Sequence, residues 1–140
     1  MNVKFGLMKR LNVSTKKMKK VILITGASSG MGKETARVLG RDGHIVYAAA
    51  RRIDQMKDLR ELGVIPLQMD ITREADVQQV VDTIMAKEGK IDVLWNNAGY
   101  GLYGAVEDVP MDEARRQFEV NIFGLALLTQ KVIPFMRMAG

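Results

Sequence analysis

Short apolar runs alternate with amphipathic stretches along most of this chain. The runs predict strands at residues 21–24, 44–50, 64–69 and 91–95. Between and after them, apolar positions recur at helical spacing, which predicts helices over about 30–41, 54–62 and 72–88 and a long helix that ends near residue 133. Strands that alternate with helices are typical of a parallel sheet covered by helices on both faces.

Individual residues are expected to begin, end or bury these elements. Asp54 and Thr72 are suitable N-caps for the helices that follow them. Trp95 ends an apolar run and is expected in the core. The inward face of the first helix is predicted to consist of its apolar positions and one threonine, which are Met31, Thr35, Val38 and Leu39.

The strand order follows from the handedness of the connections. Right-handed crossovers, with a reversal across the sheet after the third strand, give the order 3-2-1-4. The predicted fold class is therefore α/β, a Rossmann-type doubly wound parallel sheet that reaches about four strands in this chain. Ligands of such sheets bind where the order switches, at the carboxyl ends of strands one and four.

A glycine-rich loop lies at one of those two ends. The sequence Thr25-Gly26-Ala27-Ser28-Ser29-Gly30-Met31-Gly32 follows the first strand and leads into the first helix. Glycines allow a tight turn and a close backbone approach to a phosphate, and the helix N-terminus offers amides and a positive dipole end. A loop of this kind predicts a nucleotide site, although alone it is weak evidence.

A second motif, Asn96-Asn97-Ala98-Gly99, follows the fourth strand. Together with the spacing Gly-x-x-x-Gly-x-Gly in the loop, it resembles the short-chain dehydrogenase/reductase family, and the resemblance runs from about Met18 to Gly140. The resemblance implies a nicotinamide cofactor held by the loop residues Gly26, Ser28, Ser29, Gly30, Met31 and Gly32.

The resemblance also implies catalytic residues that this chain does not contain. Family members carry a Ser on a fifth strand and then a Tyr-x-x-x-Lys pair. The three tyrosines here do not fit, because the residues four positions after them are Arg51, Gly104 and Glu107. The chain therefore looks like the cofactor-binding half of an oxidoreductase.

Cofactor choice is expected to depend on the end of the second strand, Ala50-Arg51-Arg52. An acidic residue there would bind the ribose 2′-hydroxyl of NAD, whereas arginine can hold the 2′-phosphate of NADP with paired, charge-assisted hydrogen bonds. NADP is predicted over NAD. The alternative is that the two arginines only solvate a loop. One departure also weakens the case for NADP, because many NADP-preferring relatives have a basic residue in the glycine loop, where this chain has serines.

Further binding residues are implied by the family pattern. Asp70 resembles an adenine-contacting Asp with the backbone of Ile71 beside it, although it could equally cap the next helix or turn. Asn97 is expected near the adenosine ribose, and Ala98 and Gly99 would form a floor under the cofactor. The alternative for these three is a tight turn after a strand.

Asn121 lies within the apolar stripe of the last helix and is expected to be buried there. A buried amide needs partners, so the residue could simply pin the helix. The family pattern Asn-x-x-Gly, here Asn121-Ile122-Phe123-Gly124, implies instead a catalytic role: the Asn holds a water that links the active-site lysine to solvent.

Charge and composition exclude other classes of function. Seven of the 21 basic residues lie within residues 1–20, where no acid occurs, while the remaining 14 face 16 acids, so the net charge of +5 belongs to the amino-terminal segment. Residues 1–17 are predicted to be a disordered basic leader, or to derive from an upstream start codon, and residues 18–140 an incomplete dinucleotide-binding domain. Cysteine is absent, and no metal-ligand spacing occurs.

The function predicted from the sequence is NADP(H)-dependent hydride transfer between nicotinamide and a small-molecule carbonyl or secondary alcohol. The full-length protein is expected to be cytoplasmic and homo-oligomeric, with no nucleic-acid or membrane partner. One alternative is a non-catalytic NAD(P)-binding domain, and another is a nucleic-acid binder that uses the basic leader.

Overall fold

The computed structural model describes residues 18–140, which form a four-stranded parallel sheet with helices on both faces. Its strands are β1 (Val21–Thr25), β2 (Ile45–Ala50), β3 (Ile65–Gln68) and β4 (Val93–Trp95). They lie in the order β3-β2-β1-β4, and all three pairings are parallel. The predicted fold class and strand order are confirmed. The predicted leader, residues 1–17, lies outside the described residues.

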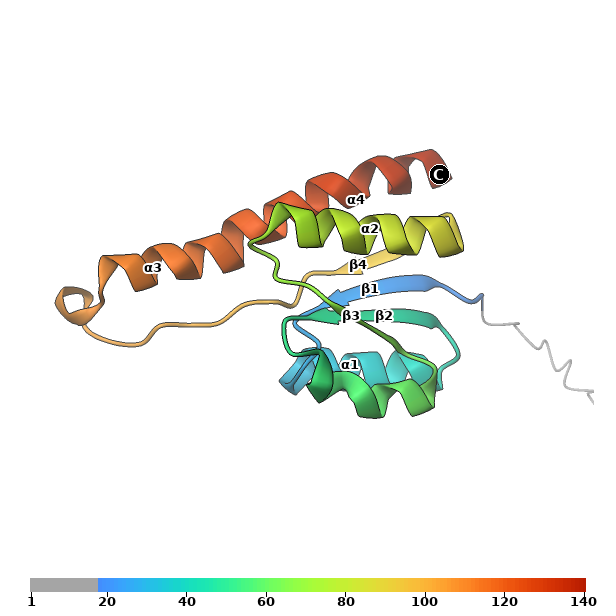
Figure 1. Cartoon of the computed structure of the whole chain (residues 1–140), viewed down its shortest axis with the longest axis horizontal. Coiled ribbons are helices and arrows are strands. Elements are labelled where there is room, and N and C mark those ends of the chain that lie inside the picture. The colour runs from blue at the N-terminus through green and yellow to red at the C-terminus, as the bar shows by residue number, and fades with distance from the viewer. Residues whose placement is uncertain (1–17) are drawn as a thin grey trace, which may run out of the picture.

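Each face of the sheet is covered by a different pair of helices (Figure 1). Helices α2 (Glu74–Glu88) and α4 (Leu125–Ala139) cover one face, and α1 (Gly30–Arg41) and the 3₁₀ helix η1 (Ile53–Leu62) cover the other. Side chains of β1 alternate between the two layers: Val21 and Leu23 pack under α2 and α4, whereas their neighbours pack under α1 and η1. The sheet is therefore buried on both sides, as its continuous apolar runs predict.

The predicted inward face of α1 is only partly correct, since Leu39 packs against the core but two other predicted residues do not. Met31 is 81% exposed and Val38 is 48% exposed, while the buried residues of this helix are Gly32 and Ala36. A Cβ on Gly32 would overlap the side-chain amide of Asn97 and lie 2.7 Å from the carbonyl oxygen of Gly26. The helix start packs too closely on its neighbours for larger residues, so small side chains take the place of the expected apolar stripe.

Two predicted helix caps are also wrong. The first turn of η1 begins at Ile53 after Arg52, and the Asp54 carboxylate pairs with Lys57 at 2.5 Å. Helix α2 begins at Glu74, and the Thr72 hydroxyl is used in a bond to the preceding Asp70. Both side chains find a nearby partner that competes with the helix amides.

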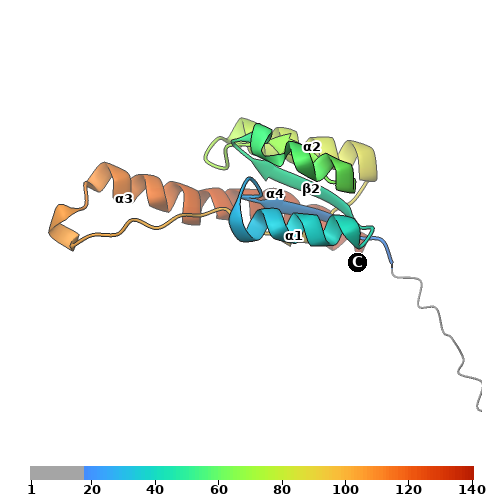
Figure 2. The same cartoon turned by 90° about the horizontal axis from the view of Figure 1, so that it is seen from below.

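The chain after β4 forms an arm that extends beyond the carboxyl ends of the strands (Figures 1 and 2). It contains a short 3₁₀ turn η2 (Val106–Asp108), helix α3 (Met111–Phe118) and the π-helix η3 (Glu119–Gly124), which continues into α4. Helix α3 has no buried residue. The sequence predicts one long helix ending near residue 133; the structure has a π-helical segment inside it, and α4 continues to Ala139.

Strand β4 is the edge of the sheet on one side. Trp95 at its end is 45% exposed, so its expected place in the core is wrong. The apolar run alone does not reveal this, because the exposure comes from the position of the strand in the sheet. Within the described chain, β4 pairs only with β1.

The helical run Met111–Ala139 is long and apolar enough to cross a membrane, by length and composition alone. Core helices of soluble proteins pass the same test. In the structure, Leu128 and Val132 of this run are fully buried against the sheet layer, and Lys131 forms an ion pair with Glu74 of α2 at 2.9 Å. Part of the run is therefore a core element of the domain.

Candidate functional site

The glycine loop is packed against the segment that follows β4. Gly26 has a φ of +66°, and a Cβ there would lie 2.8 Å from the Cα of Ala98. Gly32 is similarly crowded by Gly26 and Asn97. Two of the three glycines are thus needed for contact between loop and strand end. Gly30 differs, since it has a φ of +55° with open space where a side chain would be.

The two asparagines after β4 tie this strand end to different parts of the fold. Asn96 Nδ2 donates to the Thr129 hydroxyl on α4 at 3.0 Å. Asn97 Nδ2 donates to the carbonyl oxygen of Thr25 at 3.1 Å and to that of Gly26 at 3.4 Å. The Asn97 side chain therefore holds the glycine loop in place, and it does not line the pocket described below.

Thr25 is a further site residue, which the sequence analysis did not single out. Its hydroxyl oxygen accepts hydrogen bonds from the backbone amides of Asn97 and Ala98, both at 3.0 Å, and its side chain is fully buried. This one hydroxyl joins the ends of β1 and β4. Its only sequence signal is its place directly before Gly26.

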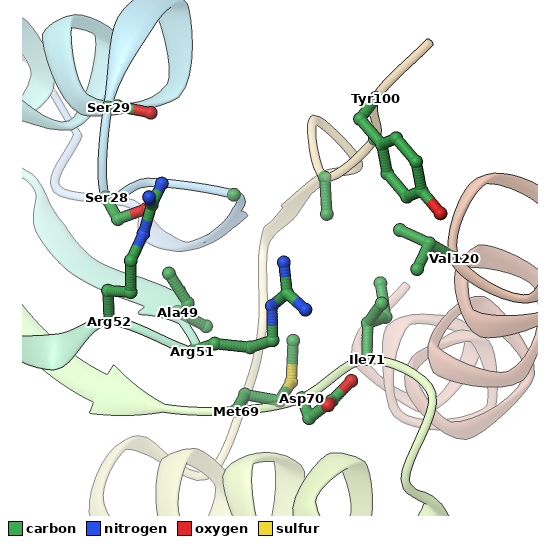
Figure 3. A pocket seen from close by; sticks show the side chains of 14 residues that line it. Ser28, Ser29, Ala49, Arg51, Arg52, Met69, Asp70, Ile71, Tyr100 and Val120 are labelled. Atoms are coloured by element: carbon green, nitrogen blue, oxygen red, sulfur yellow. The ribbon is translucent and has the colours of Figure 1, made fainter. Parts of the chain in front are cut away.

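A pocket of about 220 Å³ opens at the carboxyl ends of β1, β2 and β3 (Figure 3). Nine of the predicted binding residues line it: Gly26, Ser28, Ser29, Arg51, Arg52, Asp70, Ile71, Ala98 and Gly99. The predicted residues Gly30, Met31, Gly32, Asn97 and Asn121 are not in its lining. Sequence reasoning missed four lining residues. Ala49 lies in β2, Met69 directly follows β3, Tyr100 lies in the segment after β4, and Val120 lies in η3.

The two arginines after β2 occupy different sides of this pocket. The Arg51 side chain reaches into the space between the sheet and Tyr100 and Val120 (Figure 3). Arg52 turns towards the glycine loop, where its Nη2 donates to the Ser28 hydroxyl at 3.3 Å. Ala50 precedes them, so no carboxylate stands at the position that would bind a ribose 2′-hydroxyl. Guanidinium groups and a hydroxyl form a donor set suited to an anion.

Asp70 makes the capping contacts that its position allows. Its Oδ1 accepts hydrogen bonds from the Thr72 amide at 3.0 Å and the Thr72 hydroxyl at 2.8 Å. Partial burial works to raise the pKa of Asp70, but these bonds and the nearby charges of Arg51 and Arg73 outweigh it, and the pKa lies below its ordinary value. The side chain is therefore an anion at neutral pH, and it also lines the pocket.

Asn121 is not buried in an apolar stripe, contrary to the expectation. Its neighbours Phe118 and Ile122 are more than half exposed on the arm, where the helix becomes π-helical. The Asn121 amide instead brackets one residue: Nδ2 donates to the Tyr100 carbonyl oxygen at 2.7 Å, and Oδ1 accepts from the Tyr100 amide at 3.1 Å. Tyr100 lines the pocket, so Asn121 holds one wall of it.

Gln117, one helical turn before Asn121, makes a parallel contact. Its Oε1 accepts a hydrogen bond from the Leu102 amide at 2.8 Å. Leu102 lies in a second hollow of about 610 Å³ that extends the pocket towards α3 and shares Arg51, Asp70, Tyr100 and Val120 with it. The side-chain amides of Asn121 and Gln117 thus fix the backbone of Tyr100 and Leu102, which line the pocket and the second hollow.

Comparison with known proteins agrees with this arrangement. The family model described as short chain dehydrogenase matches residues 20–140. The chain belongs to this family. A 3-ketodihydrosphingosine reductase from Bacteroides thetaiotaomicron is 42% identical over 120 residues, which are 85% of this chain and 43% of that relative. This chain therefore spans less than half the length of this curated relative.

Solved structures of short-chain dehydrogenases share the fold. One from Streptomyces avermitilis has a TM-score of 0.83 and 36% identity, covering 87% of this chain and 46% of its own. L-sorbose reductase from Gluconobacter frateurii, complexed with NADPH and L-sorbose, has a TM-score of 0.80 and 27% identity over 87% and 49% of the two chains. A 3-ketoacyl-(acyl-carrier-protein) reductase from Brucella melitensis, complexed with NADH, has a TM-score of 0.81 and 36% identity, covering 85% of this chain and 51% of its own. Relatives of this chain thus bind either nicotinamide cofactor.

Proposed function

We propose that this chain is the NADP(H)-binding half of a short-chain dehydrogenase/reductase that interconverts a carbonyl and a secondary alcohol. The observation that carries the choice of NADP(H) is the donor set of Arg51, Arg52 and the Ser28 hydroxyl at the carboxyl end of β2. Two guanidinium groups favour a phosphate on the ribose, and Ala50 leaves no carboxylate to repel it.

The remaining binding roles follow from the positions of the residues around the pocket. The backbone of the glycine loop, Ser28 to Gly32, would hold the pyrophosphate at the start of α1, where Gly30 leaves open space. Asp70 and Ile71 would contact the adenine. Ala98 and Gly99 would form the floor below the cofactor, and Asn97 would support the ribose side through its hold on the loop.

Bound NADPH would supply a hydride to a carbonyl carbon. The oxygen then needs a proton, which a positioned acid typically accelerates by roughly 10²- to 10⁴-fold. The sequence has no Tyr-x-x-x-Lys pair, and Asn121 is the one residue of the family's catalytic set present here. We propose that Asn121 belongs to the proton relay of the whole enzyme and that the 140-residue chain alone binds cofactor without turnover.

The other properties of the whole protein are proposals on the same basis. We propose a small-molecule carbonyl or alcohol as the substrate, a cytoplasmic location and a homo-oligomeric full-length enzyme, with residues 18–140 as its dinucleotide-binding domain. The name of one relative, 3-ketodihydrosphingosine reductase, fits a carbonyl substrate for this chain without specifying which one.

A titration of the 140-residue chain with NADPH and with NADH tests the proposal. We expect NADPH to bind more tightly, and NADPH oxidation in the presence of carbonyl compounds to stay at the background rate. Equal affinities would remove the argument for NADP. Steady turnover would show that another group in this chain acts as the acid. The runner-up function, a non-catalytic NAD(P)-binding domain, would be favoured if a full-length protein that carries the downstream Ser and Tyr-x-x-x-Lys also failed to turn over.

A further inference from the structure

Lys33 stands at a junction between the glycine loop and the helix that follows the two arginines. It lies in the first turn of α1, directly after Gly32, and its side chain is only 24% exposed. Its ammonium group donates to the Gln55 carbonyl oxygen at 2.5 Å and pairs with the Asp58 carboxylate at 2.8 Å. Both partners belong to η1, so one side chain joins the two elements.

The contacts of η1 lead back to the pocket. The Gln55 amide donates to the Arg52 carbonyl oxygen at 3.2 Å, which fixes the start of η1 relative to Arg52. The Arg52 guanidinium donates to Ser28 in the glycine loop. Three contacts, Lys33 to Gln55, Gln55 to Arg52 and Arg52 to Ser28, therefore form a closed circuit with the chain itself, and the Lys33–Asp58 pair gives Lys33 a second hold on η1.

Asp58 holds a second side chain of α1 as well. Its Oδ2 accepts a hydrogen bond from Arg37 Nη2 at 2.9 Å, while its Oδ1 faces Lys33. The carboxylate thus bridges two successive turns of α1. Fully buried Met56 and Leu59 hold the rest of η1 on the domain, so loss of the bridge would leave the helix in place and release mainly its first turn.

We propose that Lys33 and Asp58 are positioning residues for cofactor selection, because they fix the turn that presents Arg51 and Arg52 to the ribose 2′-phosphate. Neither residue lines the pocket, so neither would touch the phosphate. Their effect would come from holding the arginines in a ready arrangement, which lowers the cost of ordering them on binding. This inference rests on the proposed preference for NADP(H).

The experiment compares two ligands that differ only in the 2′-phosphate, adenosine 2′,5′-bisphosphate and 5′-AMP, by calorimetric titration of the 140-residue chain. In Asp58→Ala and Lys33→Met we expect affinity for the bisphosphate to fall roughly three- to tenfold, the effect of about one hydrogen bond. Affinity for 5′-AMP should change by less than about twofold. Lys33→Arg, which keeps a cationic donor, should recover most of the loss.

Asp58→Ala is the decisive variant, because a simple charge effect has the opposite sign. Removal of a negative charge near the site would strengthen phosphate binding, whereas loss of positioning weakens it. The matched control is Lys57→Met, which removes a charge from the exposed Lys57–Asp54 pair on the same helix and should leave both affinities nearly unchanged. A thermal melt of each variant establishes that it is folded, and Lys33→Met carries the test if Asp58→Ala does not fold.

Three outcomes would overturn the inference while leaving the NADP(H) preference intact. Unchanged or higher bisphosphate affinity in Asp58→Ala excludes a positioning role, and so does an equal loss for both ligands, which indicates general damage to the site. A loss in Lys57→Met as large as in Lys33→Met would indicate a nonspecific charge effect. A wild-type chain that binds both ligands equally would instead reject the proposed NADP(H) preference itself, and the inference with it.

Discussion

At the scale of single residues, the candidate site depends on side chains whose neighbours are far away in the sequence. Arg51 could be predicted, because its distance from the glycine loop and its place after a strand are visible in the chain. The role of Thr25 could not, since its hydroxyl binds amides about 70 residues later, and only the pairing of β1 with β4 brings them together. The dual amide contact of Asn121 with Tyr100 was missed for the same reason.

Replacing Arg51 tests the residue that reaches into the pocket. Arg51→Ala should weaken NADPH binding by roughly 1.5–3 kcal/mol, the contribution of a charge-assisted hydrogen bond, and weaken NADH binding much less. Calorimetric titration of both cofactors measures the two losses. Arg60→Ala, which replaces an exposed arginine of η1 that does not line the pocket, is the control. Equal losses for the two cofactors in Arg51→Ala would show that Arg51 does not contact the 2′-phosphate.

Gly32 tests the close packing of the glycine loop. In Gly32→Ala the new methyl group would overlap the Asn97 amide and lie 2.7 Å from the Gly26 carbonyl oxygen, so the loop must shift. We expect a loss of about 1–3 kcal/mol in the free energy of unfolding, typical of overpacking, although alanine favours helix. Urea denaturation measures it, with Arg41→Ala at the exposed end of the same helix as control. An unchanged or increased stability would mean that the loop has room that the structure does not show.

At the scale of elements, the periodic apolar pattern was sufficient for the sheet and for the helices that cover it. Glycines with positive φ at positions 43, 63 and 89 lie at the ends of the helices, where the sequence predicts breaks. The helix faces and starts were harder to predict. Gly32 and Ala36 face inward where larger residues were expected, because the pattern records hydrophobicity but not the distance between elements. The π-helical turn at Glu119–Gly124 has no signal in the periodicity.

At the amino-terminal ends of the strands, the carboxylate of Asp92 links the start of β1 to the start of β4. Asp92 Oδ2 accepts a hydrogen bond from the Val21 amide at 2.7 Å, and Lys90 lies 3.1 Å away. The Val21 amide is the main cause that lowers the pKa of Asp92, with Lys90 adding to it against the opposing effect of burial. Because the pKa is lower in the folded state, the stabilisation is present above the unfolded pKa of about 3.9 and disappears as the pH falls through the folded pKa.

Asp92→Ala should therefore lower the free energy of unfolding by about 1.5–3 kcal/mol at pH 7, the contribution of a hydrogen bond to a charged group. The difference from the wild type should shrink once the pH falls below about 4. Urea unfolding across this pH range checks both statements, and Asp82→Ala, at an exposed position of α2, should show a smaller loss. A stability difference between Asp92→Ala and the wild type that is independent of pH would show that the ionised Asp92 carboxylate does not provide the stabilisation.

At the scale of the whole molecule, apolar surface is uncovered at the β4 edge of the sheet and on the arm. Strand β4 pairs on one side only among the described strands, and Trp95 at its end is exposed. Phe118, Ile122 and Phe123 on the arm are between 51% and 58% exposed. Uncovered strand edges and apolar patches of this kind promote association.

Residues 18–140 expressed alone should accordingly self-associate or be poorly soluble. Sedimentation velocity over a range of concentrations measures this directly, and Phe123→Lys, which places a charge on the exposed arm, should reduce the association. Met31→Lys, at a still more exposed apolar site on the opposite helix layer, is the matched control and should have little effect. A stable, monodisperse monomer in the unaltered chain would contradict the prediction.

The central claim is that the pocket at the carboxyl ends of the strands binds NADP(H). Titration of the ¹⁵N-labelled chain with NADPH, followed by amide chemical shifts, tests it most directly. The account predicts that the shifts concentrate in the glycine loop, Arg51, Arg52, Asp70 and the segment from Asn97 to Gly99, with NADH perturbing Arg51 and Arg52 less than NADPH does. Shifts confined to other surfaces, or none at cofactor concentrations that saturate related reductases, would contradict it.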